Sequence, residues 1–257
     1  MQHTQYSTTR AVHWAVPSPT HVYGAQPFFT PGAAETVELI SARCGLGDAS
    51  LLLDVAYGRG EASCRLAARH GCHAIGVDVH PYARACQEGA RRRGVGALTS
   101  FVAGDGAHLP VREALCDVAI CIGAPSIVGS EACIGEMHRA LRPGGFLAVS
   151  DWVWANSPIP PEAIPPGIPS TPSLEDYADI VRGIGFEVTY AEPLPQRVWD
   201  DYYAPLRQNL ARMRAEGPTT PHGSIDDELS IFDSGLAAKH WRYAVVLARR
   251  LPAQERR

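Results

Sequence analysis

From residue 50 to residue 155 the chain alternates short apolar runs with stretches of helical periodicity. The apolar runs are SLLLDVA, HAIGVDV, LTSFVAGD, CDVAICIG and GFLAVSDWV. Each is nearly continuous in apolar residues, which is typical of strands covered by helices on both faces. The helical stretches are EASCRLAARHG, YARACQEGARRRG and EACIGEMHRALR. Short connections and helical crossovers predict an α/β fold with a doubly wound, mostly parallel sheet.

The segments outside this alternation have a different composition. Residues 1–30 are rich in aromatic residues, His and Pro, and we expect them to form a lead-in or lid. Residues 31–257 are then one domain. Its first helix begins at Pro31, with Thr30 before it as the cap. Within that domain the proline-rich stretch 157–172 predicts a flap, because proline fits neither a helix interior nor a central strand.

The remainder of the chain continues with helical and strand patterns. Ser173 and Asp176 have the spacing of a helix cap and predict a helix that reaches Gly183. We expect a strand over 185–190, a long helix over 198–216 and a final strand over 241–248.

Charge and cysteine content limit the partners and the compartment. The formal net charge of the 257 residues is -4, which gives no reason to expect a nucleic acid or an anionic membrane as partner. The seven cysteines are odd in number, lie mostly in apolar runs and form no Cys-x-x-Cys pair. We therefore expect reduced thiols in the cytoplasm. The sequence shows neither a secretory signal nor an apolar run of about 18 residues.

Polar and glycine residues follow four of the expected strands. Gly58 and Gly60 follow the first strand, Asp78 the second, Asp105 the third and Gly123 the fourth. Because the carboxyl ends of parallel strands meet at one edge of a sheet, a ligand lying across that edge would touch all of them.

The glycine turn leaves two cofactor classes open. A dinucleotide fingerprint would continue to a third glycine, but Ser63 stands at that position, so a NAD(P)-dependent oxidoreductase would need a degenerate motif. A phosphate-binding loop would need a Gly-Lys-Ser/Thr ending, which is missing. Asp54 precedes the turn, where a carboxylate can face a cationic ligand such as S-adenosylmethionine.

These residues as a set resemble the class I S-adenosylmethionine-dependent methyltransferases, in their small-molecule branch. The matching stretches are LDVAYGRG at 53–60, GVDVH at 76–80, GDGAHLP at 104–110 and LRPGG at 141–145. The resemblance implies a Rossmann-like seven-stranded sheet whose last strand is antiparallel. It implies an enzyme that transfers a methyl group from S-adenosylmethionine to N, O, S or C of a small, partly apolar molecule. A non-catalytic S-adenosylmethionine-binding protein remains the alternative.

The resemblance also assigns cofactor contacts by position. It places Asp54, Ala56, Gly58 and Gly60 at the methionine end of the cofactor, Asp78 and Val79 at the ribose, Asp105 and Gly106 at the adenine, and Cys121 and Gly123 beside the sulfonium. Ala56 stands where the family motif has its first glycine. Tyr57 replaces a small residue, and its ring either covers the cofactor or faces the core.

The acceptor site is less defined, because the methyl donor is already activated and the family has no universal catalytic residue. The catalytic candidates are Asp151, at the carboxyl end of the fifth strand, and His13 and His21 in the lead-in. Candidate acceptor contacts are the aromatic residues Tyr23, Trp152 and Trp154.

Two further partner classes are not expected. The Asn/Asp-Pro-Pro-Tyr signature of base-amino methyltransferases is missing after the fourth strand, which argues against nucleic-acid substrates. The cluster His70, Cys72 and His73 has no zinc spacing, so we expect no metal. For the oligomeric state, a monomer and a homodimer both remain open.

Overall fold

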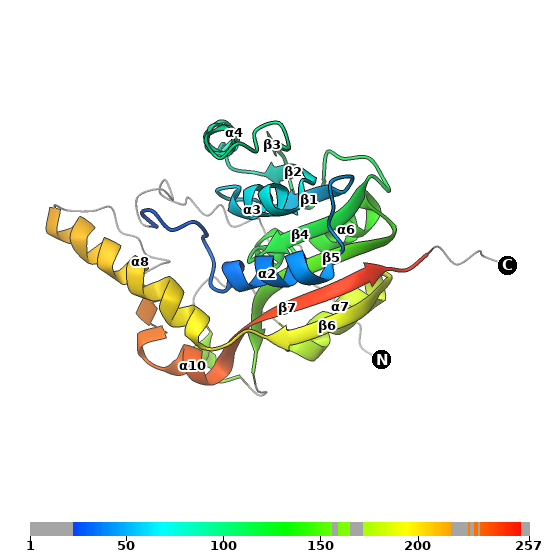
Figure 1. Cartoon of the computed structure of the whole chain (residues 1–257). Helices are drawn as coiled ribbons and strands as arrows, with labels where there is room; N and C mark the ends of the chain where they lie inside the picture. The colour runs from blue at the N-terminus through cyan, green and yellow to red at the C-terminus, as the bar shows by residue number, and fades with distance from the viewer. Residues whose placement is uncertain are drawn as a thin grey trace, which may run out of the picture.

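Seven strands form one sheet in the computed structural model, which describes residues 23–155, 159–164, 172–216, 226, 229–230 and 232–252. The strand order is β3-β2-β1-β4-β5-β7-β6 (Figure 1). In chain order the strands are β1 (Leu51–Val55), β2 (His73–Asp78), β3 (Thr99–Ala103), β4 (Cys116–Ile122), β5 (Leu141–Trp154), β6 (Phe186–Pro193) and β7 (Trp241–Arg250).

The directions of the strands match the expected fold. β1 pairs in parallel with β2 and β4, β2 with β3, and β4 with β5. β7 is inserted between β5 and β6 and runs antiparallel to both. The doubly wound, Rossmann-like sheet with an antiparallel last strand is therefore confirmed. Its chain reversal between β1 and β4 creates the switch point at which such sheets bind ligands.

Helices cover both faces of the sheet. The longer ones are α2 (Ala33–Arg43), α3 (Glu61–His70), α4 (Ala83–Arg92), α6 (Ser130–Ala140), α7 (Leu174–Ile184) and α8 (Arg197–Glu216). In Figure 1, α2 and α3 lie in front of the sheet, and α6 and α7 lie behind it. Adjacent strand residues alternate between the two resulting cores: Leu52 packs with the α2, α3 and α8 side, whereas Leu53 packs with the α6 and α7 side.

Two short helices complete the described elements. The four-residue helix α5 (Pro125–Val128) follows β4, and α10 (Leu236–His240) precedes β7. The sequence pattern did not predict α5, because one turn is too short to show a helical period. None of the helices in the described ranges is long and apolar enough to cross a membrane.

The two predicted helix starts had different outcomes. Ser173 caps α7 as expected, and its hydroxyl accepts a hydrogen bond from the Asp176 amide at 3.2 Å. The prediction that Thr30 caps the first helix is wrong: α2 begins at Ala33, after Gly32 in a left-handed conformation. The Thr30 hydroxyl instead contacts the hydroxyl of Tyr243 on β7, so a tertiary contact replaces the local cap.

Most of the expected flap lies outside the described residues. Of the stretch 157–172, only 159–164 and 172 are described, and they include the 3-10 turn η1 (Pro161–Ala163). The indole N–H of Trp241 donates a hydrogen bond to the Ala163 carbonyl at 2.8 Å. This contact attaches the described part of the stretch to the start of β7.

Candidate active site at the carboxyl ends of the parallel strands

A cavity of about 270 Å³ opens where β1, β2 and β4 end. Part of its lining consists of residues of these strand ends and the turns after them, which we call the strand-end wall: Asp54, Ala56, Gly58, Asp78 and Gly123. Another part consists of mostly apolar side chains, which we call the apolar wall: Tyr23, Phe28, Phe29, Ile127 and Val128. Motif residues and the lead-in thus meet in one cavity.

A second, larger hollow lies elsewhere on the surface. It measures about 700 Å³ and is lined by residues of α2 and of the β6–α8 connection, among them Glu38, Tyr190 and Arg197. None of the residues of the β1 turn lines it. Size alone therefore does not identify the functional site, and the smaller cavity is the one at the switch point of the sheet.

The turn after β1 brings its backbone into the cavity through three left-handed residues. Ala56, Gly58 and Gly60 have φ of 58°, 53° and 68°. A Cβ atom at Gly60 would lie 2.6 Å from the ring of Phe101, so only glycine fits there. Ala56 adopts the conformation of the glycine that it replaces, at a cost of about 1 kcal/mol. Gly58 and Ala56 line the cavity, whereas Gly60 forms the start of α3 beneath it.

Tyr57 in this turn points into the core. Its ring is buried against Phe101, with ring centroids 4.9 Å apart, in a cluster that includes Cys64 and Cys86. Of the two alternatives for this residue, the structure therefore supports core packing, although part of Tyr57 also reaches the cavity lining.

Asp54 provides a buried carboxylate at the end of β1. Its Oδ2 accepts a hydrogen bond from the Ser63 hydroxyl at 2.7 Å. Burial raises the pKa of this carboxyl to about 7, and the nearby Asp78 charge acts in the same direction. A cation bound in the cavity would favour the ionised form. Ser63, which broke the dinucleotide fingerprint, thus has a role of its own in orienting Asp54.

Asp78 links the end of β2 to the glycine turn. Its Oδ2 accepts a hydrogen bond from the Gly58 amide at 2.9 Å, and its Oδ1 accepts one from the His80 amide at 2.9 Å. The side chain is buried but lines the cavity. Val79, the next residue, is 66% exposed and also lines it. Each carboxylate oxygen keeps further acceptor capacity for a ligand hydroxyl.

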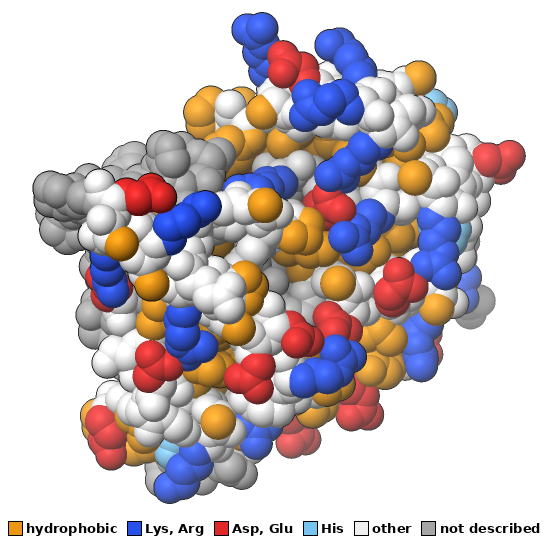
Figure 2. Space-filling model, turned by 60° about the vertical axis from the view of Figure 1, so that its left-hand side comes forward, with side chains coloured by type: hydrophobic (Ala, Val, Ile, Leu, Met, Phe, Trp, Pro, Cys, Tyr) orange, Lys and Arg blue, Asp and Glu red, His pale blue; other side chains and the backbone are white. Residues whose placement is uncertain are grey.

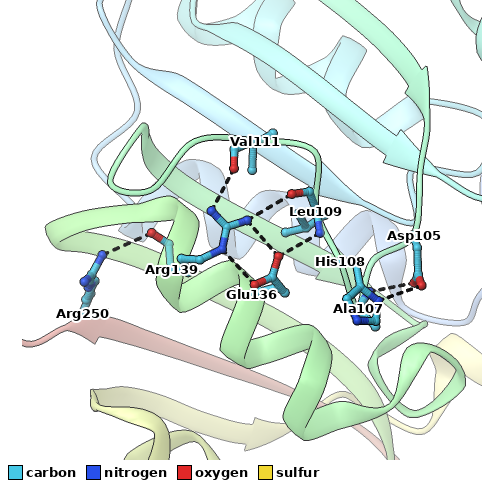
Figure 3. Close-up of polar contacts among 8 residues, drawn as sticks. All are labelled: Asp105, Ala107, His108, Leu109, Val111, Glu136, Arg139 and Arg250. Carbon is cyan, nitrogen blue, oxygen red and sulfur yellow. Dashed lines mark hydrogen bonds and ion pairs between the residues drawn. The ribbon is translucent and has the colours of Figure 1, made fainter.

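The loop after β3 separates the two residues that were predicted to contact adenine. Gly106 lines the cavity, and a Cβ atom there would lie 2.9 Å from Val55. Asp105 is not among the described lining residues. Its exposed carboxylate accepts hydrogen bonds from the Ala107 amide at 2.8 Å and from His108 Nδ1 at 3.1 Å (Figure 3). These hydrogen bonds lower the pKa of Asp105.

Helix α6 holds this loop in place. Glu136 accepts a hydrogen bond from the Leu109 amide at 2.8 Å. Arg139 pairs with Glu136 and donates to the carbonyls of Leu109 at 3.0 Å and Val111 at 2.8 Å (Figure 3). The position of Gly106 in the cavity wall therefore depends on residues that the sequence motifs did not indicate.

At the end of β4, Gly123 lies at the cavity, whereas Cys121 lies in the core. Gly123 has a φ of 78° and lines the cavity, and a Cβ atom there would lie 2.3 Å from the Thr30 hydroxyl. Cys121 is fully buried beneath it, and burial raises the pKa of its thiol well above the usual range. The close approach of Thr30 explains why this position requires glycine.

Asp151 is buried behind the cavity and holds α5. Its Oδ2 accepts a hydrogen bond from the Ser126 amide at 2.7 Å, and its Oδ1 accepts from the Ser126 hydroxyl at 3.0 Å and the Trp152 amide at 2.8 Å. Burial raises the pKa of the carboxyl to about 6. Asp151 does not line the cavity, but Ile127 and Val128 of α5 do.

The candidate acceptor contacts are divided between the cavity and the core. Tyr23 lines the cavity. Trp152 and Trp154 do not; both pack on Trp241, with ring centroids 4.9 and 3.9 Å away. His13 and His21 lie outside the described residues. Sequence reasoning missed Ile127, which is 66% exposed at the cavity, because α5 carries no recognisable motif.

Comparison with known proteins decides the family. A family model for a methyltransferase domain matches residues 53–149. The chain is 30% identical to the protein YjhP of Escherichia coli (strain K12) over 173 residues, which are 65% of this chain and 69% of YjhP. The chain belongs to the class I S-adenosylmethionine-dependent methyltransferases. The predicted resemblance is thereby confirmed, and the oxidoreductase alternative is set aside.

More distant similarities agree with this family. The methyltransferase is 28% identical to the sterol 24-C-methyltransferase of Eremothecium gossypii over 176 residues, which cover 64% of this chain but only 47% of that protein. It thus spans about half the length of that relative. It shares its fold with a methyltransferase of Thiobacillus denitrificans solved with S-adenosyl-L-homocysteine, at a TM-score of 0.75 and 22% identity over 91% of this chain and 98% of that one.

The cavity fits the family's cofactor. S-adenosylmethionine is the methyl donor of this enzyme family. The buried Asp54 carboxylate suits its positively charged end, and the glycine turn allows the backbone to approach closely. Asp78 retains acceptor positions for ribose hydroxyls. This methyltransferase is therefore an S-adenosylmethionine-dependent enzyme.

Proposed function

We propose that this methyltransferase holds S-adenosylmethionine along its strand-end wall. Asp54, with the backbone of Ala56, Gly58 and Gly60, takes the methionine end. Asp78 and Val79 take the ribose, Gly106 takes the adenine, and Gly123 lies beside the sulfonium, with Cys121 beneath. The observation that carries this proposal is the presence of Asp54, Gly58 and Asp78 in one cavity with a hydrogen bond between Gly58 and Asp78. A direct contact of Asp105 with adenine stays a prediction.

The acceptor in this proposal is a small, partly apolar molecule. Val79 and Ile127 are the most exposed large apolar side chains of the described residues, at 66% each, and both lie at this cavity. Of these two, Ile127 belongs to the apolar wall, together with Phe28, Phe29 and Val128. Such side chains favour an acceptor with apolar surface next to its reacting atom. A sterol methyltransferase among the relatives agrees with this class of acceptor.

Positioning is the contribution of the chain in this mechanism. The bound cofactor supplies a methyl group that is already activated for transfer. The protein then has to align the acceptor, exclude water and stabilise the cation through Asp54. All three hydrogen bonds to Asp151 come from Ser126 and Trp152, so we propose that Asp151 acts on α5 and not on an acceptor proton. The roles of His13 and His21 as bases stay predictions.

The surroundings of the enzyme complete the proposal. We propose a cytoplasmic location, supported by seven cysteines that are all free and buried. We propose no nucleic-acid or membrane partner, and a monomer or homodimer. The net charge of -4 supports the absence of a nucleic-acid or anionic-membrane partner. Figure 2 shows acidic side chains close to basic ones on the same face. Arg93, for example, forms an ion pair with Glu61 at 2.5 Å.

Isothermal titration with S-adenosylmethionine, S-adenosylhomocysteine and NADH tests the proposal. We expect both adenosyl ligands to bind and NADH not to bind. Release of S-adenosylhomocysteine would then be measured with a panel of amines, phenols, thiols and alkenes of graded apolarity. Binding without turnover of any acceptor would support a non-catalytic binding protein, and binding of NADH alone would contradict the proposal.

A further inference from the structure

A segment far from the sequence motifs crosses the cavity. Residues 23–30, which we call the strap, contribute Tyr23, Pro27, Phe28, Phe29 and Thr30 to the lining. Among the described residues, the one backbone hydrogen bond inside the strap runs from the Gln26 amide to the Tyr23 carbonyl, at 3.0 Å. A segment with so little internal structure depends on outside contacts to stay in place.

Helix α8 supplies two of these contacts through one residue. The hydroxyl of Tyr202 donates a hydrogen bond to the Phe29 carbonyl at 2.7 Å. The Tyr202 carbonyl accepts a hydrogen bond from the Gln26 side chain at 3.1 Å. Tyr202 is buried, and it is not among the residues that line the cavity. Its influence on a ligand would therefore pass through the strap.

The glycine turn holds the strap from the other side. Arg59 stands between Gly58 and Gly60, and its guanidinium donates to the Gly24 carbonyl at 2.8 Å. The same guanidinium lies over the Phe29 ring, 5.0 Å from the centroid. The turn that we assign to the cofactor is thus also one of the anchors of the strap.

We propose that Tyr202 and Arg59 are positioning residues that fasten the strap across the cofactor cavity, and that release of the strap admits and discharges the cofactor. This inference rests on the proposed function. Because Arg59 belongs to the turn at the cavity, cofactor binding and strap closure are coupled, and each favours the other. Helix α8 lies outside the matched methyltransferase domain, so it adds control of exchange to the common cofactor site.

Tyr202→Phe is the decisive variant, because it removes one hydroxyl outside the cavity and keeps the ring. We expect the dissociation rate of S-adenosylhomocysteine in stopped flow, and the KM for S-adenosylmethionine, to rise about 3- to 10-fold. kcat should change less than about twofold, because the Tyr202 hydroxyl itself lies outside the cavity. Gln26→Ala, which removes the second α8 contact, should act in the same direction.

Tyr190→Phe is the matched control. Tyr190 lies on β6, under the guanidinium of Arg43, and does not line the cofactor cavity. It should leave cofactor dissociation unchanged. If Tyr202→Phe behaves like Tyr190→Phe, or if it lowers kcat without any change in cofactor dissociation, the proposal is overturned.

Amide hydrogen exchange without ligand separates this inference from the proposed function. In Tyr202→Phe, the Gln26 amide, which donates to the Tyr23 carbonyl, should exchange about 3- to 10-fold faster than in the wild type, with α3 and α6 unchanged. This readout does not depend on which ligand the cavity takes. Failure of the wild type to bind either adenosyl ligand would reject the proposed function. An unchanged amide exchange rate in the strap of Tyr202→Phe would reject the proposal that Tyr202 fastens it.

Discussion

The two walls of the cavity are built in opposite ways. The strand-end wall comes from neighbouring strand ends, and polar hydrogen bonds such as that of Gly58 with Asp78 fix its shape. The apolar wall comes from the strap and from α5, and contacts between residues far apart in sequence hold it, such as Tyr202 with Phe29. We propose that the first wall holds the cofactor and that acceptor specificity depends on the second, because it is built from loop and short-helix residues.

The largest effect is expected in the strand-end wall, from Gly60→Ala. A Cβ atom would meet Phe101 at 2.6 Å in a left-handed conformation, so we expect a loss of about 2–4 kcal/mol in the free energy of unfolding in urea. Gly94→Ala is the control, because its φ is 77° but nothing lies within 4 Å. It should cost only about 1 kcal/mol. Equal losses in the two variants would contradict the packing argument.

Asp54 should make cofactor affinity depend on pH. Because burial raises its pKa to about 7, the free protein is protonated below that value and loses the charge that attracts the cation. We expect the Kd for S-adenosylmethionine in calorimetry to rise about five- to sixfold between pH 7 and pH 6. Asp54→Asn should bind about 10- to 100-fold more weakly at pH 8 and show no such step.

The Asp54 carboxyl should also make folding stability depend on pH. Cofactor binding favours its ionised form, whereas folding without cofactor favours its protonated form. A raised pKa means that the folded state favours the protonated form, so the contribution of Asp54 to stability is lost as pH rises from its unfolded value of 3.8 to about 7. Asp54→Asn should remove this loss and be at least as stable as the wild type at pH 8. If the free energy of unfolding of the wild type, taken relative to that of Asp54→Asn, rises between pH 3.8 and about pH 7, the assignment is contradicted.

Asp151 joins β5 to α5, which carries part of the apolar wall, and its variant should have an intermediate effect. If it holds α5, Asp151→Asn should raise the acceptor KM about tenfold while kcat falls only a few-fold. Ser126→Ala removes only the hydroxyl donor, and it should raise the acceptor KM about threefold. A loss of kcat beyond about 100-fold with an unchanged KM would instead indicate a general base.

The smallest effect is expected at the edge of the apolar wall. Ile127 is largely exposed, so Ile127→Ala should leave the melting temperature nearly unchanged. It should raise the KM for an apolar acceptor about threefold and leave the Kd of the cofactor unchanged. Val102→Ala, an exposed valine on β3 away from the cavity lining, is the control. If Ile127→Ala and Val102→Ala have the same KM for the acceptor, α5 does not contribute to acceptor recognition.

The two walls also differ in how far the sequence predicts them. The strand runs, the glycine turn and the Ser173 cap are local signals, and the structure has them where they were expected. The apolar wall depends on tertiary contacts that no local pattern encodes. Thr30 contacts Tyr243 and does not cap a helix, and α5 is a single turn. The Phe29 carbonyl accepts a hydrogen bond from Tyr202, which is 173 residues away in the sequence. Asp105 matched its motif, yet its carboxylate is occupied by its own loop.

A crystal structure of the full chain with S-adenosylhomocysteine tests the proposed cofactor site. We expect ligand density in the cavity at the ends of β1, β2 and β4, with the amino-acid end next to Asp54 and Gly58 and the ribose next to Asp78. Ligand density in the groove at Tyr190, or a cavity without ligand density at saturating ligand, would contradict this assignment.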